Sequence, residues 1–424
     1  HSAEAARPAQ AEGRGQDARE CYHSLRPVPP TGRNRSRDNR RPVRGRTHRE
    51  FRPTDRWKRD HPLDHPARHL PESSGTRAEL AEAAAILTSM RARLAVVAVL
   101  SAALWLAAAP PLAARDGGLG AWKLWRSTRG VVDIAGPRSD GRFVVAARGR
   151  LFLLRPRDGR LSPYPAKGIA YAANPKLEPY LTVAGPGQRM PSARCSFPRD
   201  TVYAIEPAGR TRVFAVTPAG RVRRLARIPG VKTLNGIVFD TTGRFGGRLL
   251  VVGLTADGHG VLASVDCLGR TRVRTRSAPH LEGGLAIAPA AFGAFAGDLI
   301  APDEVDGRLL ALAPDGSVRD LVDPGQPAGG DIGVESLGIV PDARAGAYLA
   351  DRHSPGNANP GHDSILRIGA GALGQAGVLA GDLLVTLEGG GTTIDVHCAA
   401  ACTAREVATA PSGAHAEGSI AFAP

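Results

Sequence analysis

The 424-residue sequence lacks the short motifs that mark several familiar enzyme classes. It has no Gly-x-Ser-x-Gly turn to present a serine nucleophile and no Gly-x-x-x-x-Gly-Lys-Ser/Thr loop to hold phosphates. The sequence therefore marks neither a serine hydrolase of the elbow type nor a P-loop nucleotide-binding protein.

Aromatic residues and lysine are scarce as well. Aromatics make up 5% of the chain, against 51 Gly and 34 Pro, a composition that suits many short strands joined by turns better than long helices. The formal net charge is +15 and nearly all basic residues are Arg, a bias that GC-rich codon usage also produces. We expect no nucleic-acid partner; the alternative is an Arg-rich nucleic-acid-binding arm within residues 33–59.

Long hydrophobic runs are absent too. The longest mainly apolar run, residues 94–109, is shorter than the roughly 20 residues that a membrane-spanning helix needs. It follows the cationic stretch from Met90 to Arg93 and is succeeded by a small-residue end at Leu112-Ala113-Ala114, which is the layout of a secretory signal peptide. We predict a cleaved signal over residues 90–114 and a secreted or cell-envelope product without a stable membrane span; a retained anchor is the alternative.

The segment that precedes this signal, residues 1–89, is rich in Arg and Pro and shows almost no aliphatic periodicity. Such a composition cannot bury a core. We therefore predict a disordered leader that is not part of the native product.

The chain contains five cysteines, an odd number. Setting Cys21 aside with the leader leaves four, which allow three pairings in an exported domain. Cys398 and Cys402 can close a small loop, which leaves Cys195 and Cys267 for a long-range bridge. A zinc site is a weaker hypothesis, because no second closely spaced cysteine pair accompanies Cys398 and Cys402.

A short phrase recurs in the second half of the chain and sets the expected architecture. Each copy has an acidic residue or Asn, then small residues, then alternating apolar residues that end near Pro or Asp. The copies are residues 234–240, 281–289, 334–341 and 416–424. Successive polar residues Asn235, Glu282 and Glu335 are 47 and 53 residues apart, which is the size of one four-stranded propeller blade.

We predict an all-β fold, a six-bladed β-propeller with four-stranded blades, for residues 115–424. Short alternating segments with Asp-Gly turns, as in residues 297–322, support the four strands of a blade. Because the chain ends in a copy of the phrase, we expect its last strand to be the inner strand of a blade whose other strands come from residues 142–164, so that the N- and C-terminal strands of the mature chain close the ring. The alternative is a β-sandwich with an additional domain.

The polar residue that opens each phrase is the first candidate for chemistry. In a propeller the innermost strands line the channel, so Asn235, Glu282, Glu335 and Glu417 would meet at one mouth. Carboxylate and amide oxygens in a ring suit Ca²⁺ or another divalent cation. The alternative is that these side chains cap the inner strands by bonding to neighbouring backbone.

A polar loop over residues 351–363 is the second candidate. It holds two His, two Asp and two Asn, and loops often carry function. We predict ligand binding by His353, Asn357, His362 and Asp363. A solvated surface loop explains the same composition.

The Asn-Gly and Glu-Gly phrases resemble motifs of the SMP-30/gluconolactonase propellers; NHL/TolB-like and virginiamycin-lyase-like propellers would look much the same. The resemblance implies a divalent metal on the channel axis, held by a Glu, an Asn and an Asp, and hydrolysis of lactones or related esters. Glu417 and Asn235 match the first two ligands. Asp351 is the candidate for the third, catalytic position, although the motif around it does not match.

These features predict an exported, monomeric propeller that binds a small molecule or a protein at its channel mouth, with a possible axial Ca²⁺ or other divalent cation. The main alternative is a metal-dependent lactonase or esterase. A relative of the quinone-dependent sugar dehydrogenases is a third hypothesis, weakened by the lack of a clear catalytic His and cofactor loop.

Overall fold

The computed structural model describes residues 118–171, 178–186, 188–206 and 209–424. These residues belong to one structural unit of the chain, Ala103–Pro424. The predicted leader, the predicted signal segment and Cys21 lie outside the described residues. Within the described part, no helix is both long enough and apolar enough to cross a membrane.

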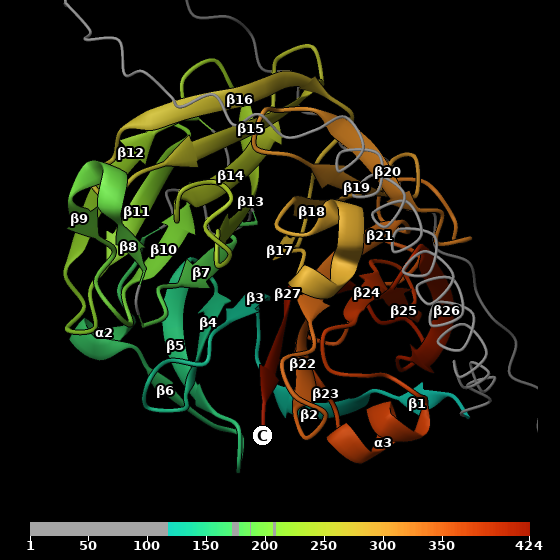
Figure 1. Cartoon of the computed structure of the whole chain (residues 1–424). Helices are drawn as coiled ribbons and strands as arrows, with labels where there is room; N and C mark the ends of the chain where they lie inside the picture. Colours follow the sequence, from blue (N-terminus) through green and yellow to red (C-terminus); the bar gives the residue numbers. More distant parts are fainter. Residues whose placement is uncertain (1–117, 172–177, 187, 207–208) are drawn as a thin grey trace, which may run out of the picture. The chain divides into compact units, whose positions relative to one another are not determined.

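Short antiparallel strands form sheets arranged around a central channel, which makes the fold an all-β propeller with four-stranded blades (Figure 1). The first sheet holds β3 (Val131–Ala135), β4 (Phe143–Ala147), β5 (Arg150–Arg155) and β6 (Arg160–Pro163), and the second holds β7 (Leu181–Val183), β10 (Val202–Ile205), β11 (Arg212–Val216) and β12 (Val222–Arg227). The third holds β13 (Thr233–Phe239), β14 (Leu249–Leu254), β15 (Gly260–Val265) and β16 (Thr271–Ala278), and the fourth holds β17 (Ala286–Ile287), β18 (Leu299–Asp303), β19 (Arg308–Leu312) and β20 (Val318–Val322).

A nine-stranded sheet contains the two ends of the described chain. Its order is β1 (Gly120–Ala121), β26 (Cys402–Thr409), β25 (Thr393–Cys398), β24 (Leu383–Leu387), β21 (Val334–Ile339), β27 (Ala416–Ala423), β22 (Gly346–Asp351), β23 (Ser364–Ile368) and β2 (Lys123–Ser127). A single parallel pair, Leu337 with Ser419, joins β21 to β27. On each side of this pair lies an antiparallel set of four strands, and β1 is added in parallel to β26.

The remaining elements are small. They are the two-stranded sheet β8 (Arg189–Met190) and β9 (Cys195–Ser196), the helices α2 (Pro165–Gly168) and α3 (Ala370–Gln375), and two 3-10 turns, Pro191–Ala193 and Ala290–Phe295. Helix α3 overlaps Gly369 to Gly374, which has the Gly-x-Gly-x-x-Gly spacing of a dinucleotide-binding turn. The six-residue helix leads from β23 to β24, which are not neighbours in the sheet, so the βαβ unit that such a turn requires is missing here.

The predicted partners of the last strand are wrong. Strand β27 pairs with β22, from Gly346 opposite Ala423 to Asp351 opposite Ala416. The strands within residues 142–164 belong instead to a sheet whose inner strand is β3. The N-terminal contribution to the β27 side of the large sheet is β2, which pairs with β23 at the outer edge.

The order of strands after the Glu335 phrase explains this difference. Strands β21 and β22 follow each other in the sequence but do not pair. Strand β21 pairs instead with β24, which begins at Leu383, 44 positions after Ile339. The intervening hairpin of β22 and β23 is left to pair with β27. The hairpin of β22 and β23 thus lies between β21 and β24 in the sequence but belongs to the neighbouring four-strand set. A simple repeat count does not predict this arrangement.

Other predictions are confirmed. The phrases at Asn235 and Glu282 each lead into a four-stranded sheet at the expected positions. Cys195 is bonded to Cys267 and Cys398 to Cys402.

Apolar side chains fill the spaces between adjacent sheets. Leu250 and Leu262 of the third sheet pack in one cluster with Leu299 and Leu310 of the fourth. Between the first sheet and β22 of the large sheet, the ring centroids of Phe143 and Tyr348 are 5.0 Å apart. Full burial of one such side chain contributes about 1.5–3 kcal/mol, so these interfaces hold the sheets together around the channel.

Glycines let the innermost segments approach one another closely. A Cβ atom on Gly284 would lie 2.5 Å from the carbonyl oxygen of Gly418 and 2.6 Å from the amide nitrogen of Leu337. The space is taken by backbone contacts: Gly283 N donates to Asn235 O and Gly284 N to Glu335 O, each at 2.9 Å. The small residues of the repeated phrase are therefore required where inner strands of different sheets touch.

Asp133 completes this contact on the other side of the channel. The carboxylate of this fully buried residue accepts hydrogen bonds from Leu181 N at 2.7 Å and from Ser419 N at 2.8 Å. Burial raises the pKa of Asp133 to about 7, although these backbone donors lower it. A continuous series of contacts thus links β13, the Gly283-Gly284 segment, β21, β27, β3 and β7.

We predict that Gly284→Ala destabilises the protein by about 1–3 kcal/mol, because an added methyl group must displace backbone atoms of two neighbouring segments. Urea unfolding followed by circular dichroism measures the change. Gly371→Ala is the matched control, because its Cβ meets no atom within 4 Å and alanine favours helix α3. Equal stability of the two variants would contradict the role of Gly284.

Candidate functional site

Acidic side chains gather at one end of the channel, where they line a cavity of about 180 Å³ that we call the acidic cavity. Its lining residues are Glu178, Tyr180, Glu282, Glu304, Asp331, Glu335, Glu388 and Glu417. Seven carboxyl groups and one phenol thus share a space of only a few water molecules. Such a concentration of like charge requires protons, cations or both.

The beginnings of inner strands supply the centre of this cavity. Glu335 and Glu417 are the second residues of β21 and β27, and both are almost completely buried. Glu282 precedes β17, while Glu304 and Glu388 directly follow β18 and β24. Because each strand enters or leaves the sheet at this end, residues far apart in sequence meet here.

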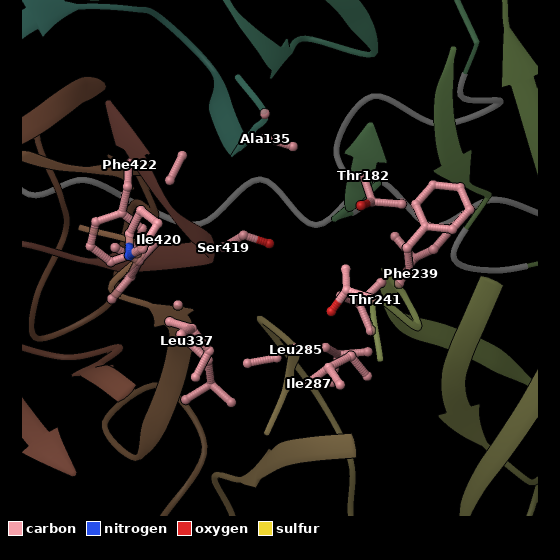
Figure 2. A pocket seen from close by; sticks show the side chains of 18 of the residues that line it. Ala135, Thr182, Phe239, Thr241, Leu285, Ile287, Leu337, Ser419, Ile420 and Phe422 are labelled. Atoms are coloured by element: carbon pink, nitrogen blue, oxygen red, sulfur yellow. The ribbon is translucent and has the colours of Figure 1, made fainter. Parts of the chain in front are cut away.

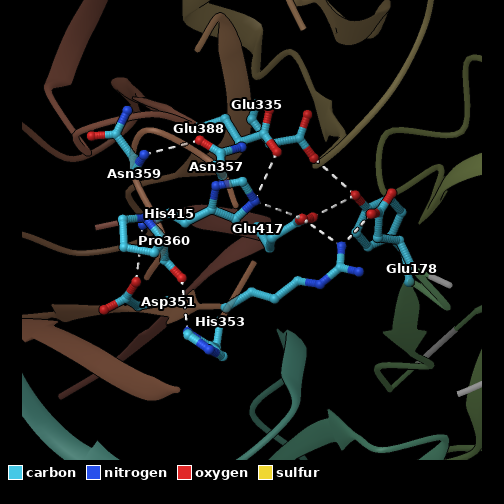
Figure 3. A network of polar contacts seen from close by, with 12 residues as sticks. Glu178, Glu335, Asp351, His353, Asn357, Asn359, Pro360, Glu388, His415 and Glu417 are labelled. Carbon is cyan, nitrogen blue, oxygen red and sulfur yellow. Dashed lines mark hydrogen bonds and ion pairs between the residues drawn. The ribbon is translucent and has the colours of Figure 1, made fainter. Parts of the chain in front are cut away.

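Three basic side chains contact this cluster, and one of them is His280, whose Nε2 lies 3.5 Å from Glu282 Oε2. Arg352 donates a hydrogen bond to Glu417 Oε1 at 2.8 Å and also contacts Glu178. His415 Nε2 lies 3.0 Å from Glu388 Oε1 and 3.5 Å from Glu417 Oε1 (Figure 3). Glu417 is therefore held from two sides by positive groups.

Tyr180 joins two of the carboxyl groups. Its hydroxyl oxygen lies 2.9 Å from Glu335 Oε1 and 2.8 Å from Glu417 Oε2. A phenol has one proton to donate, so the second contact requires a proton on a carboxyl group. Burial, together with the nearby charge of Glu417, raises the pKa of Glu335 well above its usual range. We infer that protonated Glu335 donates to Tyr180, which donates to ionised Glu417.

The pKa values of the carboxyl groups are spread widely. Burial raises the pKa of Glu282 to about 9 and that of Glu304 to about 8, with the neighbouring carboxylates adding to both shifts. The charge of Glu417 and burial raise the pKa of Glu178 to about 7. Burial alone would raise the pKa of Glu417 as well, but His415 and Arg352 outweigh it and lower that pKa.

The pKa of His415 is lowered by burial and raised by neighbouring carboxyl groups. Burial lowers the pKa of an imidazole, but the bonds to Glu388 and Glu417 dominate and raise the pKa of His415 to about 10. At neutral pH the ring is therefore an imidazolium placed between two carboxyl groups.

Several buried polar atoms at this site have no hydrogen-bond partner among the described residues. They include Glu335 Oε2, Glu388 Oε2 and His415 Nδ1, and also Nδ1 of His280 beside Glu282. Buried polar groups normally find a partner, and an orphan atom costs about 1–3 kcal/mol. In addition, one ligand atom each of Asp331, Glu388 and His415 lies within 4.8 Å of the others. Carboxylate oxygens and an imidazole fit a divalent cation.

Three of the residues predicted from the repeated phrase meet in the acidic cavity: Glu282, Glu335 and Glu417. Asn235 is buried next to them and, against the larger effect of burial, its side chain lowers the pKa of Glu282. Whether the four bind a metal stays a prediction.

Asp351 is not among the residues that line the cavity. Its buried carboxylate accepts hydrogen bonds from His415 N at 2.9 Å and His362 N at 3.2 Å, and its second oxygen lies 2.7 Å from His362 Nδ1. Both oxygens are thus engaged in holding the loop and the backbone before β27. The catalytic role predicted for Asp351 stays a prediction.

The other predicted loop residues bond mainly within the loop. His353 Nδ1 lies 3.0 Å from Pro360 O, and Asn357 Oδ1 accepts a hydrogen bond from Asn359 N at 2.9 Å (Figure 3). Asp363 accepts a hydrogen bond from Gly130 N at 2.7 Å. These contacts fix the loop that starts with Arg352, and ligand binding by His353, Asn357, His362 and Asp363 stays a prediction.

The sequence did not predict several residues of this site. Glu388 had a detectable signal, because Leu387-Glu388-Gly389-Gly390 repeats Leu281-Glu282-Gly283-Gly284. His415 also had one, since it stands two positions before Glu417. Glu178, Tyr180, Glu304 and Asp331 lie outside the phrases, and only the fold brings them in.

Comparison with known proteins gives structural neighbours only; no family model and no curated protein matches the chain. Regucalcin from Agrobacterium tumefaciens, described as a calcium-binding protein, is 11% identical, with a TM-score of 0.43 over 72% of this chain and 83% of that one. A gluconolactonase from Xanthomonas campestris is 12% identical, with a TM-score of 0.40 over 70% and 80%. Virginiamycin B lyase from Staphylococcus aureus is 10% identical, with a TM-score of 0.37 over 68% and 74%. The SMP-30/gluconolactonase propellers that the sequence resembles are thus represented among similar structures.

The raised pKa values predict how stability depends on pH without added cations. Because the pKa of Glu282 is about 9 in the folded state and about 4.5 when unfolded, its contribution is present below pH 4.5 and is lost as the pH rises toward 9. We expect Glu282→Gln to flatten the fall in unfolding free energy between pH 5 and 9, by at most about 1.4 kcal/mol per pH unit.

Urea unfolding in EDTA at five pH values measures this slope. Glu406→Gln, at an exposed position of β26, serves as the control and should keep the wild-type slope. An unchanged slope in Glu282→Gln would show that Glu282 is ionised throughout this range.

Proposed function

We propose that the protein binds a divalent cation in the acidic cavity and uses it to hold an oxygen-bearing ligand at the channel mouth. The observation that carries the proposal is the set of buried atoms without partners, Glu335 Oε2, Glu388 Oε2 and His415 Nδ1, beside a cluster of carboxylates. A cation would satisfy the negative groups, and each would then lose its proton.

His415 marks the position where positive charge is needed. Its imidazolium stands between Glu388 and Glu417 and neutralises only part of the local negative charge. A divalent cation next to Asp331 and Glu388 would supply two charges in place of that proton. His415 would then turn from a cationic partner into a neutral ligand, which favours a metal that accepts nitrogen, such as Zn²⁺ or Mn²⁺, over Ca²⁺.

We further propose that the ring is closed and has six blades, with the nine-stranded sheet counted as two. Support comes from the six hydrophobic clusters, each of which lies between two neighbouring four-strand sets. The presence of β2 and β27 in one sheet supports closure by the two ends of the domain. The two disulfides support an exported protein.

We predict that isothermal titration calorimetry at pH 8.5 detects one cation site in the full chain, with Zn²⁺, Mn²⁺, Ca²⁺ and Mg²⁺ as probes. Glu388→Gln should weaken the tightest of them at least tenfold, because it removes a negative ligand, whereas Glu406→Gln should not. Affinity should rise as the pH increases from 6 to 8.5, because bound protons must leave. Absence of binding by all four ions at pH 8.5 would refute the proposal.

A second candidate function is hydrolysis of a lactone or ester. One observation favours it: the pKa of Glu417 is lowered while that of Glu178, bridged to it through Arg352, is raised to about 7. Environments that separate the pKa values of two carboxyl groups are typical of base and acid pairs. Glu417 would accept a proton from water as the water oxygen attacks the carbonyl carbon, and Glu178 would give its own proton to the leaving alkoxide as the acyl C–O bond breaks. A bound cation would polarise the carbonyl group.

We predict that a hydrolase would lose at least a hundredfold in kcat in Glu417→Gln, measured by pH-stat titration on a panel of aliphatic and sugar lactones. Calorimetry on the same variant separates loss of the base from loss of the cation. If the loaded wild-type protein opens no lactone of the panel faster than buffer does, the site binds without hydrolysing these substrates.

A further inference from the structure

A second and larger cavity, of about 510 Å³, lies along the later parts of the inner strands. It is bordered by the ends of β3, β13 and β21, by β7 and β17, and by the second half of β27. None of its lining residues belongs to the acidic cavity. We call it the apolar cavity.

Its walls differ completely from those of the acidic cavity. Among the described residues that line it, none has an ionisable side chain, and the largest are Phe239 and Phe422 (Figure 2). The repeated phrase accounts for the contrast, because each copy begins with a polar residue and continues with apolar ones. One inner strand thus contributes Glu335 to the first cavity and Leu337 and Ile339 to the second.

The two cavities are separated by the closely packed backbone of the inner strands. Gly284 N bonds to Glu335 O, and Asp133 receives Ser419 N, at the level between the two sets of lining residues. A Cβ atom on Gly284 or Gly418 would clash with neighbouring atoms, so there is no room for a side chain at this level. A ligand of the apolar cavity therefore does not contact a cation in the acidic cavity.

The polar side chains among the described residues that line the apolar cavity all end in hydroxyl groups. Thr182, Thr241 and Ser419 project into it from different sides (Figure 2). Thr241 is exposed at the rim, in a turn that Asp240 fixes through hydrogen bonds from Gly243 N and Phe245 N. A charged ligand would lose its hydration without gaining a partner here, which costs several kcal/mol.

The size and surroundings of the cavity favour a small molecule over a protein. Its volume falls within the range of about 300–1,000 Å³ that small-molecule sites occupy. The most exposed large apolar side chains of the described residues, such as Leu119, Leu268 and Val305, lie elsewhere, and none lines this cavity. The exposed apolar residues at the mouth are thus small ones such as Pro137 and Pro341, which offer a protein partner little to bind, and the occupant must enter the channel.

We propose that the apolar cavity binds an uncharged small molecule with an aliphatic or aromatic body and one or two hydroxyl or carbonyl groups. Transfer of its apolar surface from water to the walls drives binding, at about 25 cal/mol per Å². The threonine and serine hydroxyls orient its polar group. This site is separate from the proposed cation site and does not depend on it.

The test uses the full chain and the uncharged fluorophore N-phenyl-1-naphthylamine, which brightens when it leaves water. We expect saturable binding that EDTA does not change. Decanol should displace the probe at concentrations at least tenfold lower than decanoate or decylamine, which share its chain length but carry a charge.

Two variants locate the site. Thr241→Glu should weaken probe binding at least tenfold, because it places a carboxylate at the rim of the cavity, and Ser419→Phe should do so by filling the space. Thr409→Glu, exposed on the outer strand β26, is the matched control and should bind as the wild type does. Thermal unfolding confirms that each variant folds.

Three results would each overturn the proposal. They are no saturable brightening with the wild-type protein, equal displacement by decanol and decanoate, and wild-type affinity in folded Thr241→Glu. Loss of cation binding in Glu388→Gln with unchanged probe binding would confirm that the two sites are independent.

Discussion

The close contact of the inner strands is the constraint on which the rest of the structure depends. At Gly284 and Gly418 the backbones of different sheets touch, and the buried carboxylate of Asp133 gathers the amides of Leu181 and Ser419. A side chain at either glycine would push the sheets apart. The same contact divides the channel, so that each inner strand presents polar atoms to one compartment and apolar atoms to the other. Ring geometry and site chemistry therefore follow from one short pattern of residues.

The carboxyl groups of the acidic cavity reduce the stability of the fold, and this cost makes them informative about function. Seven carboxyl groups meet there with Arg352 and His415 as the cations that contact them, so the fold holds protons on several of them near neutral pH. Clusters of this kind are unfavourable unless something compensates for the charge. A carboxylate at the rim can point into solvent and so avoid the free-energy cost of burial. Glu335 and Glu417 cannot, because each sits near the start of an inner strand whose next residues are fixed by packing.

The sequence predicted the blade pattern, both disulfides and three of the carboxyl groups, because each of these depends on residues at a regular or short spacing in the sequence. Glu282, Glu335 and Glu417 open copies of one phrase, and turn residues mark the hairpins. The pairing of β21 with β24 could not be predicted in this way, since the hairpin from Gly346 to Ile368 has the same alternating pattern and fits either sheet. Tyr180 and Glu178 precede a strand of only three residues, Leu181–Val183, which is too short for its pattern to place them.

The exchanged hairpin also determines how the acidic compartment forms. Arg352 directly follows β22 and donates to Glu417 of β27, while Asp351, the last residue of β22, accepts the amide of His415 just before β27. Arg352 N in turn donates to His415 O at 2.9 Å. Both cationic groups of the site are therefore put in place by the pairing of β22 with β27, the last strand of the chain. Without β27, Glu388 would lack the positive charge of His415, and the channel would lack one wall. The pairing of β22 with β27 thus also brings the positive charges of Arg352 and His415 to the site, so the state of the site depends on β27.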